Sequence, residues 1–179
     1  MTAILFIDRD GTLIEEPADH QVDRLDKVRL MPDVIAGLQD LARAGYRFVM
    51  VTNQDGLGSA SFPTEDFEVP HEFVLELLRS QGIHFDAVLI CPHRPDEGCD
   101  CRKPRTRLVD EYLAGVSFDR ARSAVIGDRD TDLELARRLG IAGHRITLGG
   151  PADATWADLS ARLVRPPRRA HVVRKTRET

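Results

Sequence analysis

The sequence predicts an α/β fold in which helices cover both faces of a parallel sheet. Three observations lead to this fold class. Short apolar runs recur along the chain, segments with helical apolar spacing lie between them, and polar or glycine-bearing residues follow each run. Continuous apolar runs are typical of strands buried on both faces, and their regular alternation with helices is typical of parallel sheets.

The elements follow in chain order. Four apolar runs predict strands at residues 4–7, 48–51, 87–90 and 124–126. Apolar residues at helical spacing predict helices at residues 34–41, 73–78, 108–113 and 133–139. A fifth short strand is expected around residues 144–146, and a last helix at residues 156–163. Gly45 and Gly140 stand where helix C-caps are expected.

Composition predicts one globular domain. The chain has 179 residues, of which 42% are hydrophobic and 30% charged, which is enough for a single full core. A net charge of −4 argues against nucleic-acid binding through a broad basic surface. No apolar run approaches the ~18 residues of a membrane span and no signal peptide is recognisable, so we expect a cytoplasmic protein without a membrane partner. We place the domain at residues 1–165 and a C-terminal tail or interdomain junction at residues 166–179.

Two carboxylates, Asp8 and Asp10, follow the first apolar run and precede Gly11. Open α/β sheets bind ligands beyond the carboxyl ends of their strands, so this placement favours a catalytic role. Asp-x-Asp-Gly is also a common turn sequence and the beginning of a calcium-binding loop. Leu13 and Ile14 follow instead of further oxygen ligands, which weakens the calcium interpretation and leaves the turn as the alternative.

Polar residues also follow the other predicted strands. In chain order the groups are Asp8 with Asp10, Thr52-Asn53-Gln54, Arg102-Lys103-Pro104 after a loop, and Gly127-Asp128 with Asp132. Because the carboxyl ends of parallel strands share one edge of the sheet, we expect these groups to converge there. Acids, a hydroxyl and a lysine in one place are the inventory of a magnesium-assisted phosphoryl transfer.

All three cysteines lie within eleven residues, in a segment that also contains a histidine. Together Cys91, His93, Cys99 and Cys101 have the composition of a closed structural zinc site, and a reducing cytoplasm argues against a disulfide. Reduced, unliganded thiols remain the alternative. The same loop runs into Lys103, so a bound zinc would position that lysine. The other histidines lack such partners in sequence and are expected on the surface or in the core: His20, His71, His84, His144 and His171.

Taken in this order, the motifs resemble those of the haloacid dehalogenase superfamily: Asp8-Arg9-Asp10-Gly11-Thr12, Thr52, Lys103, and Gly127-Asp128 with Asp132. The resemblance implies a Rossmann-like doubly wound parallel sheet with a minimal cap and a zinc-binding loop. In this superfamily the second aspartate, here Asp10, marks the members that process phosphates. Hydrolysis of a phosphate ester is therefore the leading functional hypothesis.

The resemblance and the needs of the reaction imply a role for each residue. Asp8 would be the nucleophile that forms an aspartyl phosphate, and Asp10 the general acid and base. Thr52 and Lys103 would bind the phosphoryl oxygens; a lysine without this motif context would be interpreted as a surface residue. Asp132 is expected beside the metal rather than bound to it. Magnesium would be held by three groups: Asp8, Asp128 and the main-chain carbonyl of Asp10.

Within the superfamily, the chain resembles two groups with a zinc loop and a minimal cap, the histidinol-phosphate phosphatases and the heptose bisphosphate phosphatases. The first fits better. The residues that resemble the phosphatase half of a bifunctional histidine-biosynthesis enzyme are 6–17, 21–24, 52–58, 61–63 and 89–93. The small phosphorylated substrate implied is L-histidinol phosphate, and the alternative is D-glycero-D-manno-heptose 1,7-bisphosphate.

Histidinol phosphate carries an ammonium and an imidazole, so carboxylates or other acceptors are expected near the phosphoryl centre. Candidate substrate-binding residues are Glu16, Asn53, Gln54 and Arg102. Glu15 and Glu16 fit an exposed turn before Pro17 equally well. Residues 55–70, rich in turn formers and acids, are interpreted as a short lid. The acids of this segment argue against a second substrate phosphate.

Residues 170–179 resemble the junction that leads into the imidazoleglycerol-phosphate dehydratase domain of that bifunctional enzyme. A dehydratase domain C-terminal to this chain is therefore an expected partner. Either an excised N-terminal domain or a stand-alone phosphatase with a junction-like tail fits the sequence. A non-enzymatic interpretation also stays open, in which the chain is a zinc-loop binding module with a vestigial site, although the intact acids weigh against it.

Overall fold

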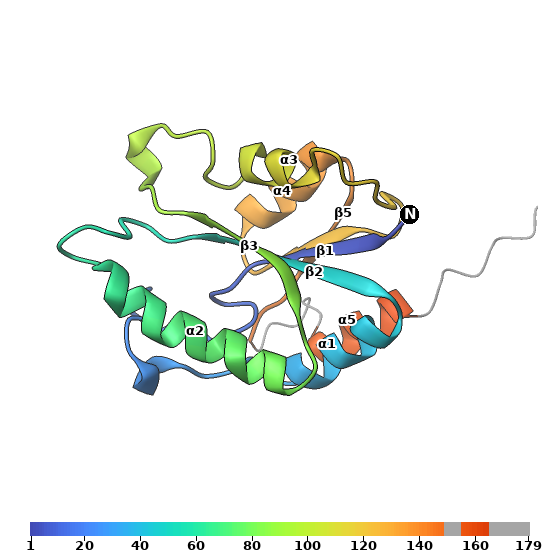
Figure 1. The fold of residues 1–179 in the computed structure, drawn as a ribbon, viewed down its shortest axis with the longest axis horizontal. Helices are drawn as coiled ribbons and strands as arrows, with labels where there is room; N and C mark the ends of the chain where they lie inside the picture. The colour runs from blue at the N-terminus through green and yellow to red at the C-terminus, as the bar shows by residue number, and fades with distance from the viewer. Residues whose placement is uncertain (149–154, 165–179) are drawn as a thin grey trace, which may run out of the picture.

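The computed structural model describes residues 1–148 and 155–164. In this part of the chain, parallel strands form one sheet in the order β3-β2-β1-β4-β5, with helices on both faces (Figure 1). The strands are β1 (Ala3–Ile7), β2 (Tyr46–Asn53), β3 (Phe85–Cys91), β4 (Ala124–Gly127) and β5 (Ala142–Arg145). The α-helices are α1 (Val34–Arg43), α2 (Thr64–Ser80), α3 (Arg107–Leu113), α4 (Asp130–Leu139) and α5 (Trp156–Val164). Two short 3-10 helices are η1 (Leu25–Lys27) and η2 (Pro95–Glu97). The predicted α/β class and parallel sheet are confirmed.

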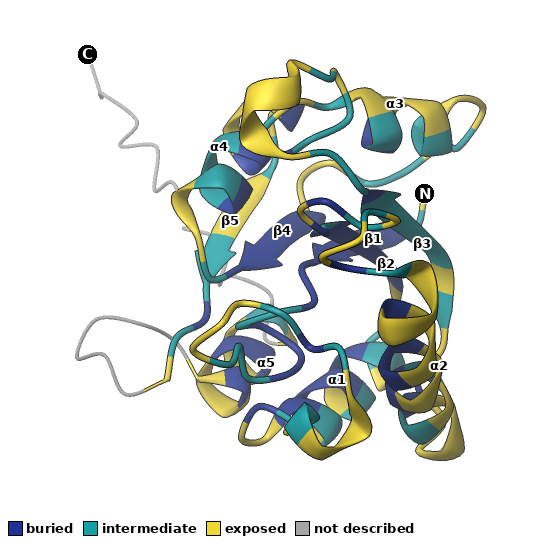
Figure 2. Cartoon of the chain, turned by 90° about the vertical axis from the view of Figure 1, so that its left-hand side faces the viewer, coloured by how far each residue is buried: buried dark blue, intermediate teal, exposed yellow. Residues whose placement is uncertain are grey.

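The sheet separates two apolar cores, which explains why the inner strands β1 and β4 contain no charged or polar residue. Leu5 and Ile7 of β1 pack in a cluster with residues of α1, α2 and α5. Ile4 and Phe6, which point to the opposite face, pack with residues of α3 and α4. Figure 2 shows β1, β2 and β4 largely buried, the edge strands β3 and β5 less so, and the outward faces of the helices exposed. Every position of β1 is therefore buried on one side or the other.

The strand order places a ligand crevice beside β1. The chain runs outward from β1 through β2 to β3 and then returns to β4 on the other side of β1. In doubly wound sheets, ligands bind beyond the carboxyl ends of the strands at such a reversal. Asp8 follows β1 and Asp128 follows β4, so the two acids flank this crevice.

Helix α2 begins nine residues before the helix predicted at residue 73, at Thr64. Glu65 and Asp66 lie in its first turn, where carboxylates interact favourably with the positive end of the helix dipole. Its buried positions recur at helical spacing: Phe67, Pro70, His71, Val74 and Leu78. The acids and the proline of residues 64–70 therefore open a helix rather than a loop, and the lid role of residues 55–70 stays a prediction. Residues 54–63 form the remaining loop.

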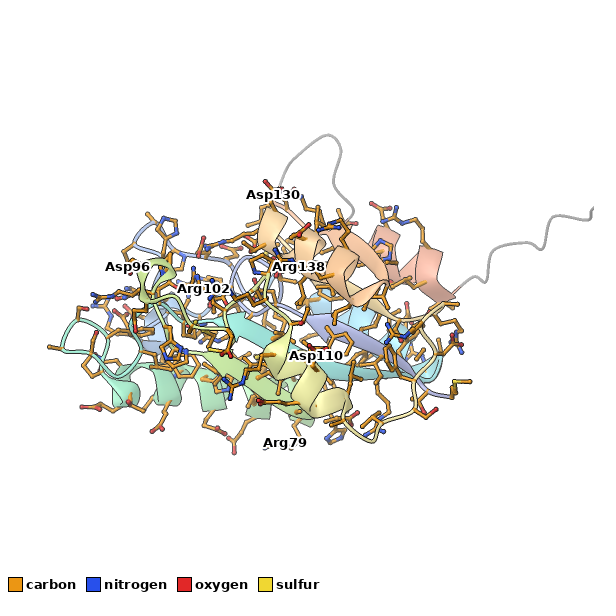
Figure 3. All side chains as sticks on the ribbon, turned by 90° about the horizontal axis from the view of Figure 1, so that it is seen from above. Arg79, Asp96, Arg102, Asp110, Asp130 and Arg138 are labelled. Atoms are coloured by element: carbon orange, nitrogen blue, oxygen red, sulfur yellow. The ribbon has the colours of Figure 1, made fainter. Side chains whose placement is uncertain are left out.

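The other predicted elements are confirmed with small changes at their ends. The fifth strand lies at Ala142–Arg145 rather than at residues 144–146, because it pairs with β4 from Ala124 to Gly127. The junction or tail predicted at residues 166–179 lies outside the described residues. None of the described helices is long and apolar enough to cross a membrane. Figure 3 shows side chains of both charges around the described surface, among them Arg79, Asp110 and Arg138.

Helix α5 closes the core that it shares with α1 and α2, and it supports the loop that follows β1. Trp156 is 1% exposed, and its indole Nε1 donates a hydrogen bond of 2.7 Å to the main-chain oxygen of Thr12. Gly37 of α1 admits the indole, since a β-carbon there would lie 3.3 Å from the β-carbon of Trp156. The first motif is thus held in place by the last described helix.

Candidate active site

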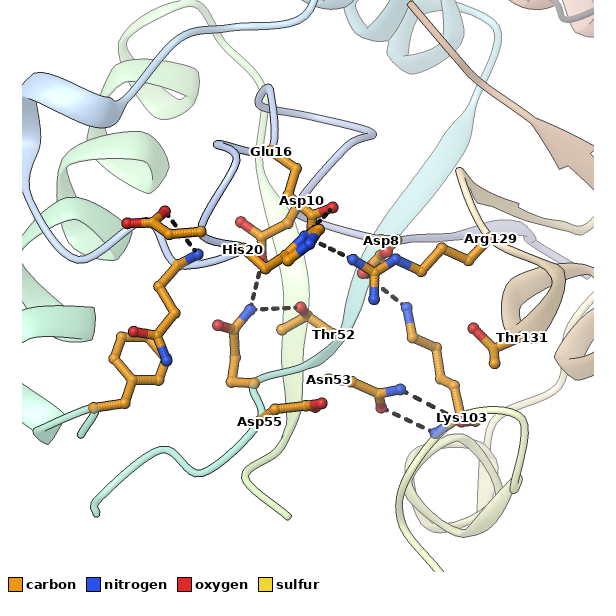
Figure 4. Close-up of a pocket in the computed structure, with 14 residues that line it drawn as sticks. Asp8, Asp10, Glu16, His20, Thr52, Asn53, Asp55, Lys103, Arg129 and Thr131 are labelled. Atoms are coloured by element: carbon orange, nitrogen blue, oxygen red, sulfur yellow. Dashed lines mark hydrogen bonds and ion pairs between the residues drawn. The ribbon is translucent and has the colours of Figure 1, made fainter. Parts of the chain in front are cut away.

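A cavity of about 500 Å³ opens at the carboxyl edge of the sheet (Figure 4). Seven of the residues predicted for the site line it: Asp8, Asp10, Glu16, Thr52, Asn53, Gln54 and Lys103. They come from the ends of β1 and β2 and from the loop before α3, as the parallel sheet requires. Arg102 is not among the lining residues. It forms an ion pair with Asp55 and donates a hydrogen bond of 3.0 Å to the main-chain oxygen of His93.

Lys103 is the electrostatic centre of the cavity floor. Its ammonium lies 2.7 Å from a carboxylate oxygen of Asp8 and 2.7 Å from one of Asp132. All three side chains are buried. Burial raises the pKa of Asp8 to about 8, and the nearby ammonium only partly opposes this. Burial alone lowers the pKa of Lys103, but the two carboxylates prevail and hold it above its usual value.

The acidic groups around Lys103 fit a divalent cation. Asp8, Asp128 and Asp132 place carboxylate oxygens within 4.8 Å of one another, against a single ammonium. Burial also raises the pKa of Asp128, and its Oδ1 atom is buried without a hydrogen-bond partner among the described residues. A hard cation with oxygen ligands, such as Mg²⁺, would satisfy that atom and offset the negative charge.

The glycine of the first motif allows this close arrangement. Gly11 has a φ of +74°, and a β-carbon at this position would lie 2.4 Å from Oδ2 of Asp128. No real side chain tolerates such a distance, so the loop after β1 can approach Asp128 only with glycine there. Gly127 has the same function on the other side, because a β-carbon there would lie 2.2 Å from the carboxylate carbon of Asp132.

Asp10 is held through both of its carboxylate oxygens. Arg9 Nη1 donates to Oδ1 at 2.8 Å, and Gln54 Nε2 donates to Oδ2 at 2.6 Å. The same Gln54 nitrogen donates to Thr52 Oγ1 at 2.8 Å. Gln54 therefore links the predicted acid to the predicted phosphoryl-binding hydroxyl. Its role as a substrate ligand stays a prediction.

Asn53 holds the main chain of Lys103. Its Oδ1 accepts a hydrogen bond of 3.0 Å from the Lys103 amide, and its Nδ2 donates one of 3.4 Å to the Lys103 carbonyl. These bonds join the end of β2 to the loop before α3. In the structure, the side-chain amide of Asn53 is therefore engaged in aligning Lys103, and its predicted contact with substrate stays a prediction.

The mouth of the cavity carries alternating charges. A carboxylate oxygen of Glu16 lies 3.0 Å from His20 Nδ1, and Glu16 forms an ion pair with Arg129. Asp19 and Asp55 add carboxylates to the same lining. Glu16 is therefore a cavity residue and not merely part of an exposed turn.

Sequence reasoning missed several residues of this site, among them His20, Arg129 and Arg9. His20 was expected at the surface or in the core, and it gives no sequence signal because its neighbours come together only through loop geometry. Arg129 follows Asp128 at a strand end, which is a signal that could have identified it. Arg9 stands inside the first motif and was assigned no role, although it is fully buried beside Asp10.

The cysteine-rich loop forms a compact group after β3. The Sγ atom of Cys91 lies 3.7 Å from that of Cys99 and 3.2 Å from that of Cys101. His93 Nδ1 lies 3.2 Å from the Cys101 sulfur and 3.6 Å from that of Cys91. A tetrahedral zinc with bonds of about 2.3 Å separates its ligands by roughly 3.8 Å, so the four groups are close to the spacing that such an ion needs. None of the three cysteines forms a disulfide.

Comparisons with known proteins agree with this geometry. The family described as HAD-hydrolase-like matches residues 100–175. The histidine biosynthesis bifunctional protein HisB of Legionella pneumophila (strain Lens) is 51% identical over 179 residues, which are all of this chain and 50% of that protein. The HisB protein of Actinobacillus pleuropneumoniae serotype 3 is 52% identical over 98% of this chain and 50% of its own length. The chain thus spans about half the length of these curated relatives.

Solved structures share the fold. D,D-heptose 1,7-bisphosphate phosphatase from B. bronchiseptica, complexed with magnesium and phosphate, superposes with a TM-score of 0.78 and 26% identity. That match covers 91% of this chain and 98% of the other. A putative HAD-like phosphatase from Mesorhizobium loti superposes with a TM-score of 0.74 and 28% identity, over 93% of this chain and 90% of the other. In its family match over residues 100–175 and in its fold, the chain is therefore similar to the HAD-like hydrolases, phosphatases among them.

Proposed function

We propose that this chain is a magnesium-dependent phosphomonoesterase that hydrolyses L-histidinol phosphate in histidine biosynthesis. The observation that carries the proposal is that Asp8, Asp10 and Lys103 line one cavity. Two further acids, Asp128 and Asp132, lie close to Asp8. The relatives that match the whole chain at about half identity are named as histidine-biosynthesis proteins, which supports the pathway. Because the chain spans only half of them, the substrate is part of the proposal.

The reaction divides between the two aspartates of the first motif. An oxygen of Asp8 attacks phosphorus and forms an aspartyl phosphate, while the bond from phosphorus to the substrate oxygen breaks. Asp10 gives its proton to that leaving oxygen, so the alcohol departs neutral. Asp10 then takes a proton from a water molecule that attacks the aspartyl phosphate, which releases inorganic phosphate and restores Asp8.

Thr52 and Lys103 bind the phosphoryl group during both steps. Lys103 supplies a buried positive charge, which is worth most where water is excluded. Magnesium would be held by Asp8, Asp128 and the main-chain carbonyl of Asp10, with Asp132 next to it. When bound, it reduces the repulsion between the carboxylate nucleophile and the anionic phosphate.

The charges at the cavity mouth favour histidinol phosphate over its alternative. Glu16, Asp19 and Asp55 can attract the ammonium and imidazole of that substrate. A second phosphate, as in heptose bisphosphate, would need free cations. Arg129 and Arg102 are nearby, but each is already paired with a carboxylate. The heptose bisphosphate phosphatase fold of a solved neighbour keeps this substrate as the second candidate.

The proposal extends to the rest of the chain. A structural zinc ion bound by Cys91, His93, Cys99 and Cys101 would fix the loop that leads to Lys103. Metal-binding thiols rather than disulfides suit a cytoplasmic location. We place the phosphatase domain at residues 1–165 and a junction toward a dehydratase domain at residues 166–179. The length of the relatives supports such a C-terminal partner.

Phosphate release tests the proposal. Wild-type protein is assayed with magnesium on L-histidinol phosphate and on heptose 1,7-bisphosphate, beside the Asp8→Asn variant. We expect kcat/KM to be higher for histidinol phosphate by on the order of 100-fold, and Asp8→Asn to lose at least about 1,000-fold. A preference for heptose bisphosphate would favour the second candidate. Release from neither ester would favour the zinc-loop binding module, and an active Asp8→Asn would reject the covalent mechanism.

A further inference from the structure

Arg9 is an arginine enclosed by the fold. Its side chain is 0% exposed, whereas the neighbouring Asp10 carboxylate is 14% exposed and lines the cavity. Arginine is rarely buried to this degree unless it is paired. The Nη1 atom donates to Asp10 Oδ1 at 2.8 Å. The Arg9 side chain therefore lies behind Asp10 and meets the site through Asp10, while the main-chain N–H of Arg9, which a substitution keeps, donates to Asp8 Oδ1 at 2.8 Å.

The surroundings of Arg9 leave Asp10 as its main polar partner. The Nε and Nη2 atoms are buried without hydrogen-bond partners within residues 1–148 and 155–164. An arginine that only stabilised the core would be expected to use these donors on main-chain carbonyls. The guanidinium instead lies over the ring of Phe67, 5.0 Å from its centroid, and Phe67 stacks on His71 of the same helix. Helix α2 thus fixes the guanidinium from behind.

A second donor completes the arrangement. Gln54 reaches the other oxygen of Asp10 at 2.6 Å and is itself tied to Thr52. Both carboxylate oxygens are therefore fixed by donors that come from different segments of the chain. A general acid must stay within hydrogen-bond reach of the atom that it protonates, and small displacements are costly. We propose that Arg9 is a positioning residue that holds the Asp10 carboxylate toward the leaving oxygen, which rests on the role given to Asp10 in the proposed function.

The nature of the leaving group separates this role from a purely structural one. An alkyl phosphate such as histidinol phosphate releases a basic alkoxide, which must be protonated as the bond breaks. An aryl phosphate such as p-nitrophenyl phosphate releases a stable phenolate that needs little protonation. The value of kcat/KM reports the steps up to departure of the leaving group. A misplaced Asp10 therefore slows the alkyl ester more than the aryl ester, whereas general damage to the site slows both alike.

The experiment compares kcat/KM for both esters in wild type, Arg9→Met and Arg9→Lys. We expect Arg9→Met to lose about 30- to 100-fold on histidinol phosphate and less than about 5-fold on p-nitrophenyl phosphate. Arg9→Lys keeps the charge and should recover part of the loss on the alkyl ester. Arg122→Met is the matched control, because Arg122 also lies over an aromatic ring, that of Tyr46 at 5.0 Å, but far from the cavity in the fold. It should leave both values unchanged.

Equal losses on the two esters in Arg9→Met, or no loss on either, would overturn the proposal. Thermal unfolding shows whether each variant is folded. If Arg9→Met does not fold, the test is the loss of kcat/KM in Arg9→Lys on the alkyl ester compared with its loss on the aryl ester. Wild-type protein that hydrolyses the aryl ester but not histidinol phosphate refutes the proposed substrate alone, and the comparison is then made with heptose bisphosphate as the alkyl ester. Wild type inactive on all three esters overturns the proposed function and this inference together.

Discussion

Replacement of Lys103 by methionine tests how the site balances its charge. Methionine keeps much of the side-chain volume and removes the ammonium that lies 2.7 Å from both Asp8 and Asp132. Two buried carboxylates are then left without a counter-charge. Loss of one partner from a buried ion pair costs about 3–5 kcal/mol. For a protein of this size each kcal/mol shifts Tm by about 2–4 °C, so the metal-free variant should unfold about 6–20 °C below wild type.

The surface of the same protein offers a geometric match. Lys27 lies 2.6 Å from Asp19 and 2.8 Å from Asp23, so it also bridges two carboxylates. The difference is exposure: the Lys27 side chain is 17% exposed and that of Asp19 is 59% exposed, against 3% for Lys103. Solvent screens the surface group, and Lys27→Met should cost less than about 1 kcal/mol. The pair of variants therefore isolates the effect of burial.

The assay is thermal unfolding of both variants and wild type without magnesium at pH 6 and pH 9, and then with magnesium. Without Lys103 the folded state binds more protons than the unfolded state in this range, so the stability of Lys103→Met should fall as the pH rises. Magnesium should stabilise this variant more than wild type, because it meets unpaired carboxylates. The reasoning is refuted if Lys103→Met loses no more stability than Lys27→Met.

Two further predictions concern His71 and the cysteine loop. Burial is the main cause that lowers the pKa of His71 from 6.5 to about 4, so the unfolded state binds the extra proton between these values. Stability should fall by about 3 kcal/mol from this group as the pH drops from 6.5 to 4, and urea unfolding at several pH values should show a shallower fall in His71→Phe. Cys99→Ser should lower kcat about 10- to 100-fold by misplacing Lys103, with zinc content measured on the same sample. Full activity in a zinc-free protein would contradict this.

Much of the fold follows from local sequence patterns. The inner strands β1 and β4 are apolar along their length because helices cover both faces of the sheet, and the predicted strands and helices are present within the described residues. The start of α2 was not predictable in the same way. Pro70 and the acids before it are typical of loops, and their helical conformation depends on Phe67 and His71 packing into the fold. Tertiary packing here outweighs local propensity.

The candidate site divides along a similar line. Residues at strand ends, such as Asp8, Thr52 and Asp128, could be predicted because a parallel sheet brings such ends to one edge. Contacts between side chains could not. The burial of Arg9 and the pairing of Glu16 with His20 depend on loop paths that no periodic pattern records, and arginine is usually an exposed residue.

The hydrogen bond from Trp156 to Thr12 also bears on how the protein is made. The two residues are 144 positions apart in the chain. At usual rates of translation, roughly 7–30 s pass between the synthesis of one and of the other. The loop that carries the two aspartates therefore leaves the ribosome well before its indole support. Until Trp156 emerges, the nascent chain holds that loop without this hydrogen bond.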